Sequence, residues 1–116
     1  MQRGEIWLVR LDPTEGSEIA KTRPALIVSN DDIGILPLKV IVPITDWKER
    51  YANRPWMVKL TPDSQSGLTK DSAADCFQVR SISETRFVQK LGSISAIYMQ
   101  KISNSLRIIL NLSLES

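Results

Sequence analysis

Three side chains in the first half of the sequence, Glu18, Arg23 and Thr45, could together act on a phosphate ester. Arginine is always charged, and its planar guanidinium matches a phosphate through two parallel hydrogen bonds. Threonine adds a hydroxyl donor, and glutamate offers a proton acceptor. Such a set could cleave RNA without a metal ion, because the ribose 2′-OH is itself the nucleophile. The protein then moves protons and stabilises the charged transition state.

A proton donor for the leaving 5′-oxygen is missing from this set, since arginine is a poor acid at neutral pH. A surface salt bridge between Glu18 and Arg23 is an alternative interpretation of the same two residues. Their spacing alone leaves both interpretations open.

The elements that must position these residues are two predicted strands, residues 5–11 and 25–29, and the connection between them. Hairpin loops usually have about two to five residues, so a longer connection on rigid strands is typical of a functional loop. Pro24 disfavours helix at Arg23 and is expected to place it at the exit of this loop, on the lip of the next strand.

Further strands are predicted from β-branched and large apolar residues between turn signals. Pro43 is expected at an edge, a bulge or a strand end, because proline cannot donate to a sheet. Gly92 and Ser93 are expected to end the last strand, and Thr45 to lie where the third one stops. The predicted ranges are 38–45, 56–61, 72–83 and 86–91.

The C-terminal segment changes to a helical period, since Met99, Ile102 and Leu106 recur at intervals of three and four residues. With Ser95 as N-cap, this predicts an amphipathic helix over residues 96–112. We therefore expect one domain, residues 1–116, with a mainly β fold: a strongly curved antiparallel sheet or small barrel capped by a C-terminal helix.

The composition excludes several classes of function. The chain has no histidine and a single cysteine, Cys76, which excludes Cys/His zinc sites and an internal disulfide framework. Cys76 is expected to be a buried small apolar residue. No P-loop, dinucleotide-binding or metalloprotease motif is present. With no long apolar run and no signal sequence, a cytoplasmic protein without a membrane segment, cofactor or metal is expected.

The segment 46–55, DWKERYANRP, mixes aromatic and basic side chains. Such mixing is typical of surfaces that bind single-stranded nucleic acid, because phosphates need cations and bases need flat partners. A solvated loop with one aromatic residue tucked in is the alternative. The net charge of +2 supports a polyanionic partner only weakly.

Four motifs, in this order and spacing, resemble those of the MazF/PemK toxin family, and the resemblance covers essentially the whole chain. They are RGEIWLVRLDPTEGSE at 3–18, TRPALIVS at 22–29, VIVPIT at 40–45 and QVRSIS at 78–83. The resemblance implies an SH3-like or CcdB-like barrel and a homodimer. It implies the toxin of a type II toxin–antitoxin system, a metal-independent, sequence-specific endoribonuclease. Such an enzyme cleaves single-stranded RNA, chiefly mRNA, to 2′,3′-cyclic phosphate and 5′-OH ends and so stops translation and growth. A small MazE-like antitoxin would be its partner.

Residue by residue, the family's loop arginine falls on Arg23, its strand-end hydroxyl on Thr45 and its loop glutamate on Glu18. Family members often carry an acidic residue immediately before the glutamine that matches Gln78. Here that position is Phe77, and the nearest acidic residue is Asp75. The catalytic assignment therefore rests mainly on Arg23 and Thr45, and Glu18 is the third candidate. The residues expected to contact RNA are Gly16, Ser17, Lys21, Trp47, Lys48, Arg50, Tyr51, Gln78 and Arg80.

Two alternative functions remain open, because fold does not fix function. A non-enzymatic toxin of the CcdB type, which binds a protein target such as gyrase, would share the barrel. An inactive homologue retained as an antitoxin-binding module is the other, with Phe77 as its only indication.

Overall fold

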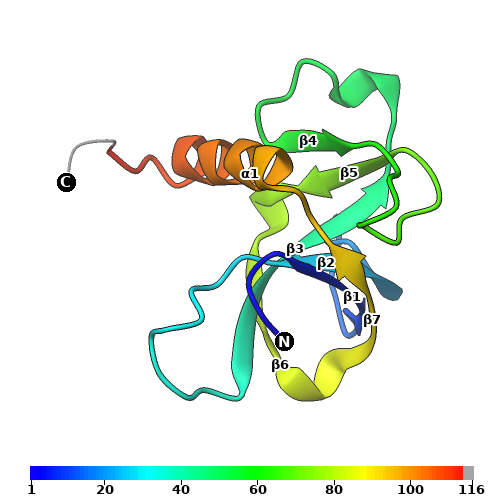
Figure 1. The fold of residues 1–116 in the computed structure, drawn as a ribbon. Helices are drawn as coiled ribbons and strands as arrows, with labels where there is room; N and C mark the ends of the chain where they lie inside the picture. Colours follow the sequence, from blue (N-terminus) through cyan, green and yellow to red (C-terminus); the bar gives the residue numbers. More distant parts are fainter. Residues whose placement is uncertain (114–116) are drawn as a thin grey trace.

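The computed structural model describes residues 1–113, so residues 114–116 of the expected domain lie outside the described part. Seven strands are followed by one α-helix, and short 3-10 turns join some of the strands (Figure 1). The elements are β1 (Glu5–Arg10), β2 (Thr22–Ile27), β3 (Leu38–Asp46), η1 (Glu49–Tyr51), β4 (Met57–Leu60), β5 (Ser72–Asp75), η2 (Cys76–Gln78), β6 (Arg80–Ser83), η3 (Glu84–Arg86), β7 (Phe87–Ser93) and α1 (Ala96–Ile109).

The strands form one bent antiparallel sheet in the order β4-β5-β3-β2-β1-β7, with β6 also paired to β3. β4 and β7 are the two ends of this order, so the ladder is not closed. Helix α1 lies beside β4 and β5 (Figure 1). The prediction of a mainly β, barrel-like fold with a C-terminal helix is confirmed. The helix of the described residues is too short to cross a membrane.

β3 is the central strand, and it changes partner along its length. Its first part pairs with β6 as far as Ile41, and its last part pairs with β5 from Ile44 onward. Pro43 lies between these two parts, buried and opposite Ala25 of β2. The expectation of an edge, a bulge or a strand end for Pro43 was therefore wrong. A proline is tolerated here because the outer ladder is interrupted at this point.

β2 begins at Thr22, so Arg23 is the second residue of the strand, at its lip, as expected. Two other strand predictions need correction. The expected strand over residues 72–83 is two short strands separated by η2, where the Asp75 carboxylate accepts the N–H of Phe77 at 3.1 Å. Gly92 and Ser93 lie inside β7 and do not end it before residue 92. A glycine is needed at position 92 because a Cβ there would come within 2.3 Å of the carbonyl oxygen of Gln65.

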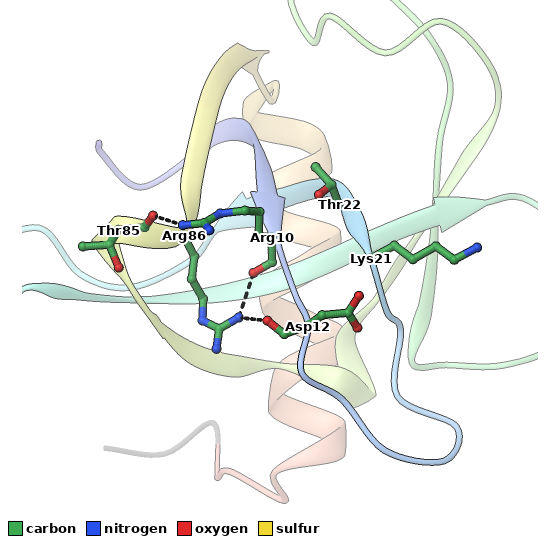
Figure 2. A pocket seen from close by; sticks show the side chains of 6 residues that line it. All are labelled: Arg10, Asp12, Lys21, Thr22, Thr85 and Arg86. Atoms are coloured by element: carbon green, nitrogen blue, oxygen red, sulfur yellow. Dashed lines mark hydrogen bonds between the residues drawn. The ribbon is translucent and has the colours of Figure 1, made fainter.

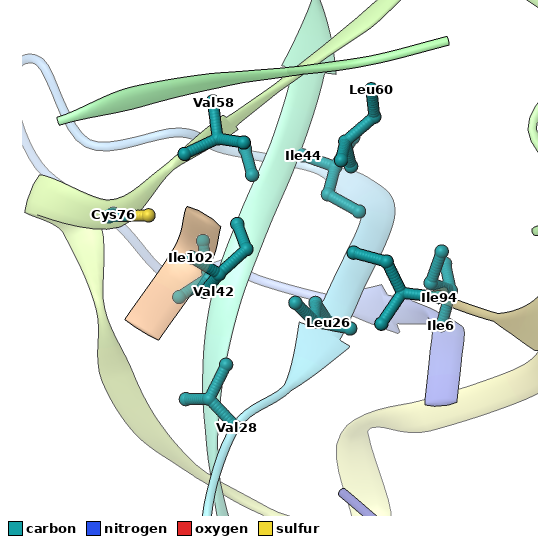
Figure 3. Close-up of a cluster of buried hydrophobic side chains, with 11 residues drawn as sticks. Ile6, Leu26, Val28, Val42, Ile44, Val58, Leu60, Cys76, Ile94 and Ile102 are labelled. Carbon is teal, nitrogen blue, oxygen red and sulfur yellow. The ribbon is translucent and has the colours of Figure 1, made fainter. Parts of the chain in front are cut away.

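Apolar residues fill both faces of the central strands, as the alternation along β3 requires. Val42 and Ile44 face the cluster that α1 covers through Ile102, whereas Ile41 faces the opposite cluster. The first cluster contains Ile6, Leu26, Val28, Val42, Ile44, Val58, Leu60, Ala74, Cys76, Ile94 and Ile102 (Figure 3). The second contains Val9, Leu11, Ala25, Ile27, Ile41 and Ile82. Cys76 is buried, as expected, and burial raises the pKa of its thiol to about 11.

The helix is anchored at both of its ends. Ser95 is the N-cap, as predicted, and its hydroxyl accepts the N–H of Tyr98 at 3.4 Å. Ser105 donates to the carbonyl of Pro55 at 2.7 Å. The helix ends at Ile109, earlier than expected, and Leu110 is 52% exposed.

Candidate active site

Arg23 and Thr45 lie on neighbouring strands and face the same cavity. Ala25 of β2 pairs with Pro43 of β3, and Arg23 and Thr45 each lie two residues beyond this pair on the same face of their strands. Both side chains line the cavity together with Leu68 and Leu91. The cavity has a volume of about 260 Å³. Arg23 Nε donates to the carbonyl of Ala20 at 3.3 Å, which fixes the guanidinium at the cavity wall.

An ion pair that the sequence did not suggest lies in the same cavity. Lys70 Nζ is 2.9 Å from Asp46 Oδ1, and both residues line the cavity of Arg23 and Thr45. The hydrogen bond from Lys70 holds the pKa of the Asp46 carboxyl below its usual value, and the charge of Arg23 acts in the same direction. No local pattern could have revealed this pair, because the pairing of β3 with β5 creates it.

Glu18 lies in a neighbouring cavity. This second cavity has a volume of about 380 Å³ and is lined by Leu11, Glu18, Ile19, Pro43, Phe77, Gln78, Val79 and Arg80. The Glu18 carboxylate accepts the N–H of Glu15 at 2.5 Å. Within residues 1–113, the ion pairs do not include one between Glu18 and Arg23, so the structure gives no support to the surface salt bridge.

Polar side chains of η2 and β6 form hydrogen bonds with the backbone of the long loop between β1 and β2. Gln78 Oε1 accepts the N–H of Ile19 at 2.6 Å, and Gln78 Nε2 donates to the carbonyl of Ser17 at 3.2 Å. Arg80 donates to the carbonyl of Leu11 at 3.2 Å. At the base of the loop, the N–H of Leu11 donates to the carbonyl of Lys21 at 2.8 Å. Gln78 and Arg80 therefore position the loop in this structure.

Asp75 does not stand in for an acidic residue at position 77. It is only 5% exposed, and its carboxylate accepts hydrogen bonds from the N–H of Phe77 and, at 3.1 Å, from Gln78 Nε2. Desolvation raises the pKa of this carboxyl, although these hydrogen bonds act in the opposite direction. The arrangement makes Asp75 the anchor of η2 and of Gln78.

The aromatic and basic side chains after Thr45 form a packed cluster. The rings of Trp47 and Tyr51 meet edge to face at 5.8 Å, and Lys59 Nζ lies 5.2 Å from the Trp47 ring centre. Tyr51 is only 9% exposed and carries Arg50 and Arg54 over its ring. Tyr51 is therefore the buried aromatic residue of this segment, whereas Lys48 and Arg50 are exposed. Contact of this segment with RNA stays a prediction.

A third cavity, of about 500 Å³, lies on the other side of the loop base and is shown in Figure 2. Arg86 donates to the carbonyls of Arg10 and Asp12, and Arg10 donates to the carbonyl of Thr85 at 2.6 Å. The Lys21 side chain points away from these two arginines. The arginines therefore brace the start of the loop against η3.

Solved structures share this fold. MazF from Deinococcus radiodurans aligns with a TM-score of 0.78 at 21% identity, covering 97% of each chain. A mycobacterial endoribonuclease, solved in complex with its cognate antitoxin, aligns with a TM-score of 0.77 at 22% identity and the same coverage. These neighbours define the fold class.

Sequence comparison shows the family to which the chain belongs. Residues 2–110 match the model of the PemK-like, MazF-like toxin of type II toxin–antitoxin systems, and the chain belongs to this family. Endoribonuclease MazF9 of Mycobacterium tuberculosis is 35% identical over 118 aligned residues, covering 97% of this chain and 98% of the relative. Endoribonuclease MazF of Staphylococcus saprophyticus is 32% identical over 112 residues, covering 97% and 92%.

Proposed function

We propose that this protein is a sequence-specific endoribonuclease that cleaves single-stranded RNA as the toxin of a toxin–antitoxin pair. The observation that carries the proposal is the shared cavity of Arg23 and Thr45, which offers a fork of N–H donors and a hydroxyl to one phosphate. Membership of the MazF-like family supports it, as do two relatives that are named endoribonucleases.

In the proposed reaction, Arg23 and Thr45 bind the scissile phosphate and stabilise the charge that develops on its oxygens. The 2′-oxygen of the preceding ribose forms a bond to phosphorus while the bond from phosphorus to the 5′-oxygen breaks. The products are a 2′,3′-cyclic phosphate and a 5′-OH. The nucleophile belongs to the substrate, so the protein needs neither a metal ion nor a cofactor for this step.

We assign the proton of the 2′-OH to Glu18. Glu18 lines the cavity next to the phosphate cavity, and the ribose that joins a base to its phosphate would lie between the two. Asp46 lines the phosphate cavity itself, but its ion pair with Lys70 lowers its pKa and makes it the weaker base.

We assign the proton for the leaving 5′-oxygen to Lys70. Its ammonium group lines the phosphate cavity and is held there by Asp46 at 2.9 Å. An ammonium group carries a transferable proton at neutral pH, which a guanidinium does not readily give up. Lys70 thus fills the role that Glu18, Arg23 and Thr45 leave open.

We further propose a homodimer and a MazE-like antitoxin as the protein partners. One structural neighbour was solved with its cognate antitoxin. The connection between β2 and β3 exposes three large apolar side chains, Ile33, Ile35 and Leu36, and Leu38 at the start of β3 is exposed beside them. Ile35 is fully exposed at 103%. Apolar patches of this kind mark protein contacts, and we assign this one to the second copy of the chain.

The test is cleavage of a long, unstructured RNA in excess EDTA, followed by chemical mapping of the new ends. Arg23→Ala should abolish cleavage while circular dichroism and thermal unfolding stay unchanged. Arg107→Ala, an arginine of α1, is the matched control and should cleave normally. Full activity of Arg23→Ala would exclude the assignment. DNA breaks in expressing cells, with RNA intact, would favour the CcdB-type function instead.

A further inference from the structure

Phe77 forms a wall of the cavity that contains Glu18, and its side chain is 64% exposed. A single exposed apolar residue is ordinary on a protein surface. Phe77 differs because its two predecessors, Asp75 and Cys76, are buried and its backbone is fixed.

Two hydrogen bonds fix the backbone at Phe77, and the ring itself packs against Trp56. Asp75 accepts the Phe77 N–H at 3.1 Å, and the Cys76 N–H donates to the carbonyl of Trp56 at 2.9 Å. The rings of Phe77 and Trp56 meet edge to face, with their centres 6.0 Å apart and their planes at 74°. A flat group that binds to this ring therefore does not have to order it first.

Charged side chains lie over Trp56, the ring partner of Phe77, and line the cavity of Phe77. Arg54 lies over Trp56 at 5.9 Å and over Tyr51 at 5.5 Å. Arg80 and Glu18 line the same cavity as Phe77. A flat apolar surface with cations beside it and hydrogen-bonding groups at its edge matches a nucleobase, which has a π-face, a polar edge and an attached phosphate.

We propose that this cavity, which we call the Phe77 cavity, binds one unpaired RNA base stacked on the Phe77 ring. The inference rests on the proposed nuclease function. Pro43 lines the Phe77 cavity and Thr45 the phosphate cavity, and these residues lie on one face of β3, about 7 Å apart along the strand. A single nucleotide spans this distance. The bound base therefore belongs to the nucleotide on the 5′ side of the scissile phosphate, whose 2′-OH is brought to Glu18.

The first experiment compares Phe77→Ala, Phe77→Leu and Phe77→Trp on an RNA with a mapped cleavage site. Loss of a stacked base should lower kcat/KM of Phe77→Ala by about 5- to 150-fold. Phe77→Leu should lose most of the same activity, and Phe77→Trp should retain it. Val88→Ala removes an exposed apolar side chain of β7 and is the matched control, with unchanged activity. Equal activity of Phe77→Ala and wild type overturns the proposal.

The second experiment removes the base from the substrate and keeps the sugar and phosphate. An abasic nucleotide 5′ of the cleaved bond should slow the wild type by about 5- to 150-fold and Phe77→Ala by less than about threefold. An equal penalty in both proteins overturns the proposal, even if cleavage itself is normal. Loss of antitoxin binding alone in Phe77→Ala also overturns it, since the ring would then serve a protein partner.

Binding of a non-cleavable, 2′-O-methyl RNA separates the base site from the nuclease function. Fluorescence anisotropy on the same variants should show the same order of affinities. If the wild type cuts no RNA but binds it in a Phe77-dependent way, the nuclease assignment fails and the base site stands. If the wild type cuts RNA and neither kcat/KM nor affinity depends on Phe77, the base site fails and the nuclease stands.

Discussion

The side-chain carbonyl of Gln78 accepts the backbone N–H of Ile19 at 2.6 Å, across 59 residues of sequence. The amide nitrogen of the same side chain donates to Ser17 and to Asp75. One glutamine thus joins the loop that carries Glu18 to the buried carboxylate beneath it. This contact determines where the loop lies above the two cavities.

We expect Gln78→Ala to loosen the loop more than it destabilises the fold. Replacing the side chain leaves the Ile19 N–H without its acceptor and removes one of the two donors to the Asp75 carboxylate, which costs about 1–3 kcal/mol. Hydrogen exchange should show faster exchange at Ile19 with little change in β3, and cleavage should slow. Gln89→Ala, an exposed glutamine of β7, is the control. Unchanged exchange at Ile19 would contradict the role given to Gln78.

Lys70→Arg tests the proton donor. The arginine keeps the positive charge and the ion pair with Asp46 but holds its proton too tightly to release it. We expect about a 100-fold or greater loss of kcat on normal RNA, in the range of general acid catalysis. An RNA with sulfur in place of the leaving 5′-oxygen needs no protonation, so wild type and Lys70→Arg should cleave it at similar rates. A loss of equal size on both substrates would assign Lys70 to binding alone.

The two carboxylates near the phosphate can be separated by their pH–rate profiles. Glu18→Gln should remove the acidic limb of the kcat/KM profile and slow cleavage by about 100-fold or more, since it removes the proton acceptor. Asp46→Asn should keep the shape of the profile, because Asp46 acts on Lys70 and not on the 2′-OH. The opposite pattern would move the role of base from Glu18 to Asp46.

Glu5 should make the fold sensitive to acid. Desolvation raises the pKa of its carboxyl, but the hydrogen bonds from Trp7, Gln2 and Lys90 outweigh this effect and lower the pKa from 4.5 to about 2. A depressed pKa in the folded state means that ionised Glu5 stabilises the fold above pH 4.5, and that this contribution is lost as the pH falls toward 2. Thermal unfolding of Glu5→Gln should therefore show a lower Tm than wild type at pH 7, and a similar Tm near pH 2.

The exposed apolar connection between β2 and β3 predicts a further change. Ile35→Asp places a charge in the centre of the proposed contact between two copies and should convert a dimer to a monomer in analytical ultracentrifugation. Ile97→Asp changes an equally large exposed residue on α1 and is the control. A wild-type protein that sediments as a monomer would exclude the homodimer.

Sequence patterns predicted most of the architecture because the apolar alternation of the strands and the helical period of α1 are local signals. They also named Arg23 and Thr45, whose meeting depends on the register of β2 with β3. They placed Pro43 wrongly, because only the full sheet reveals that β3 changes partner there. Lys70 and Asp46 were missed for the same reason, since their contact depends on strand pairing that the residues themselves do not encode.

Arg23 lies in β2 and not in the loop, and this divides the protein into two parts that can change independently. Arg23 and Thr45, the residues proposed to bind the phosphate, belong to the sheet, where a register shift would also disrupt the core. The loop and η2 lie above it and can vary with little cost to the fold. Exchange of these segments among relatives, with Glu18, Asp75 and Gln78 kept, should therefore alter which RNA sequences are cut while Arg23 and Thr45 stay unchanged. In the proposed site, phosphate binding is thus separated from choice of substrate, which would suit the fold to diversification and to engineering new cleavage sites.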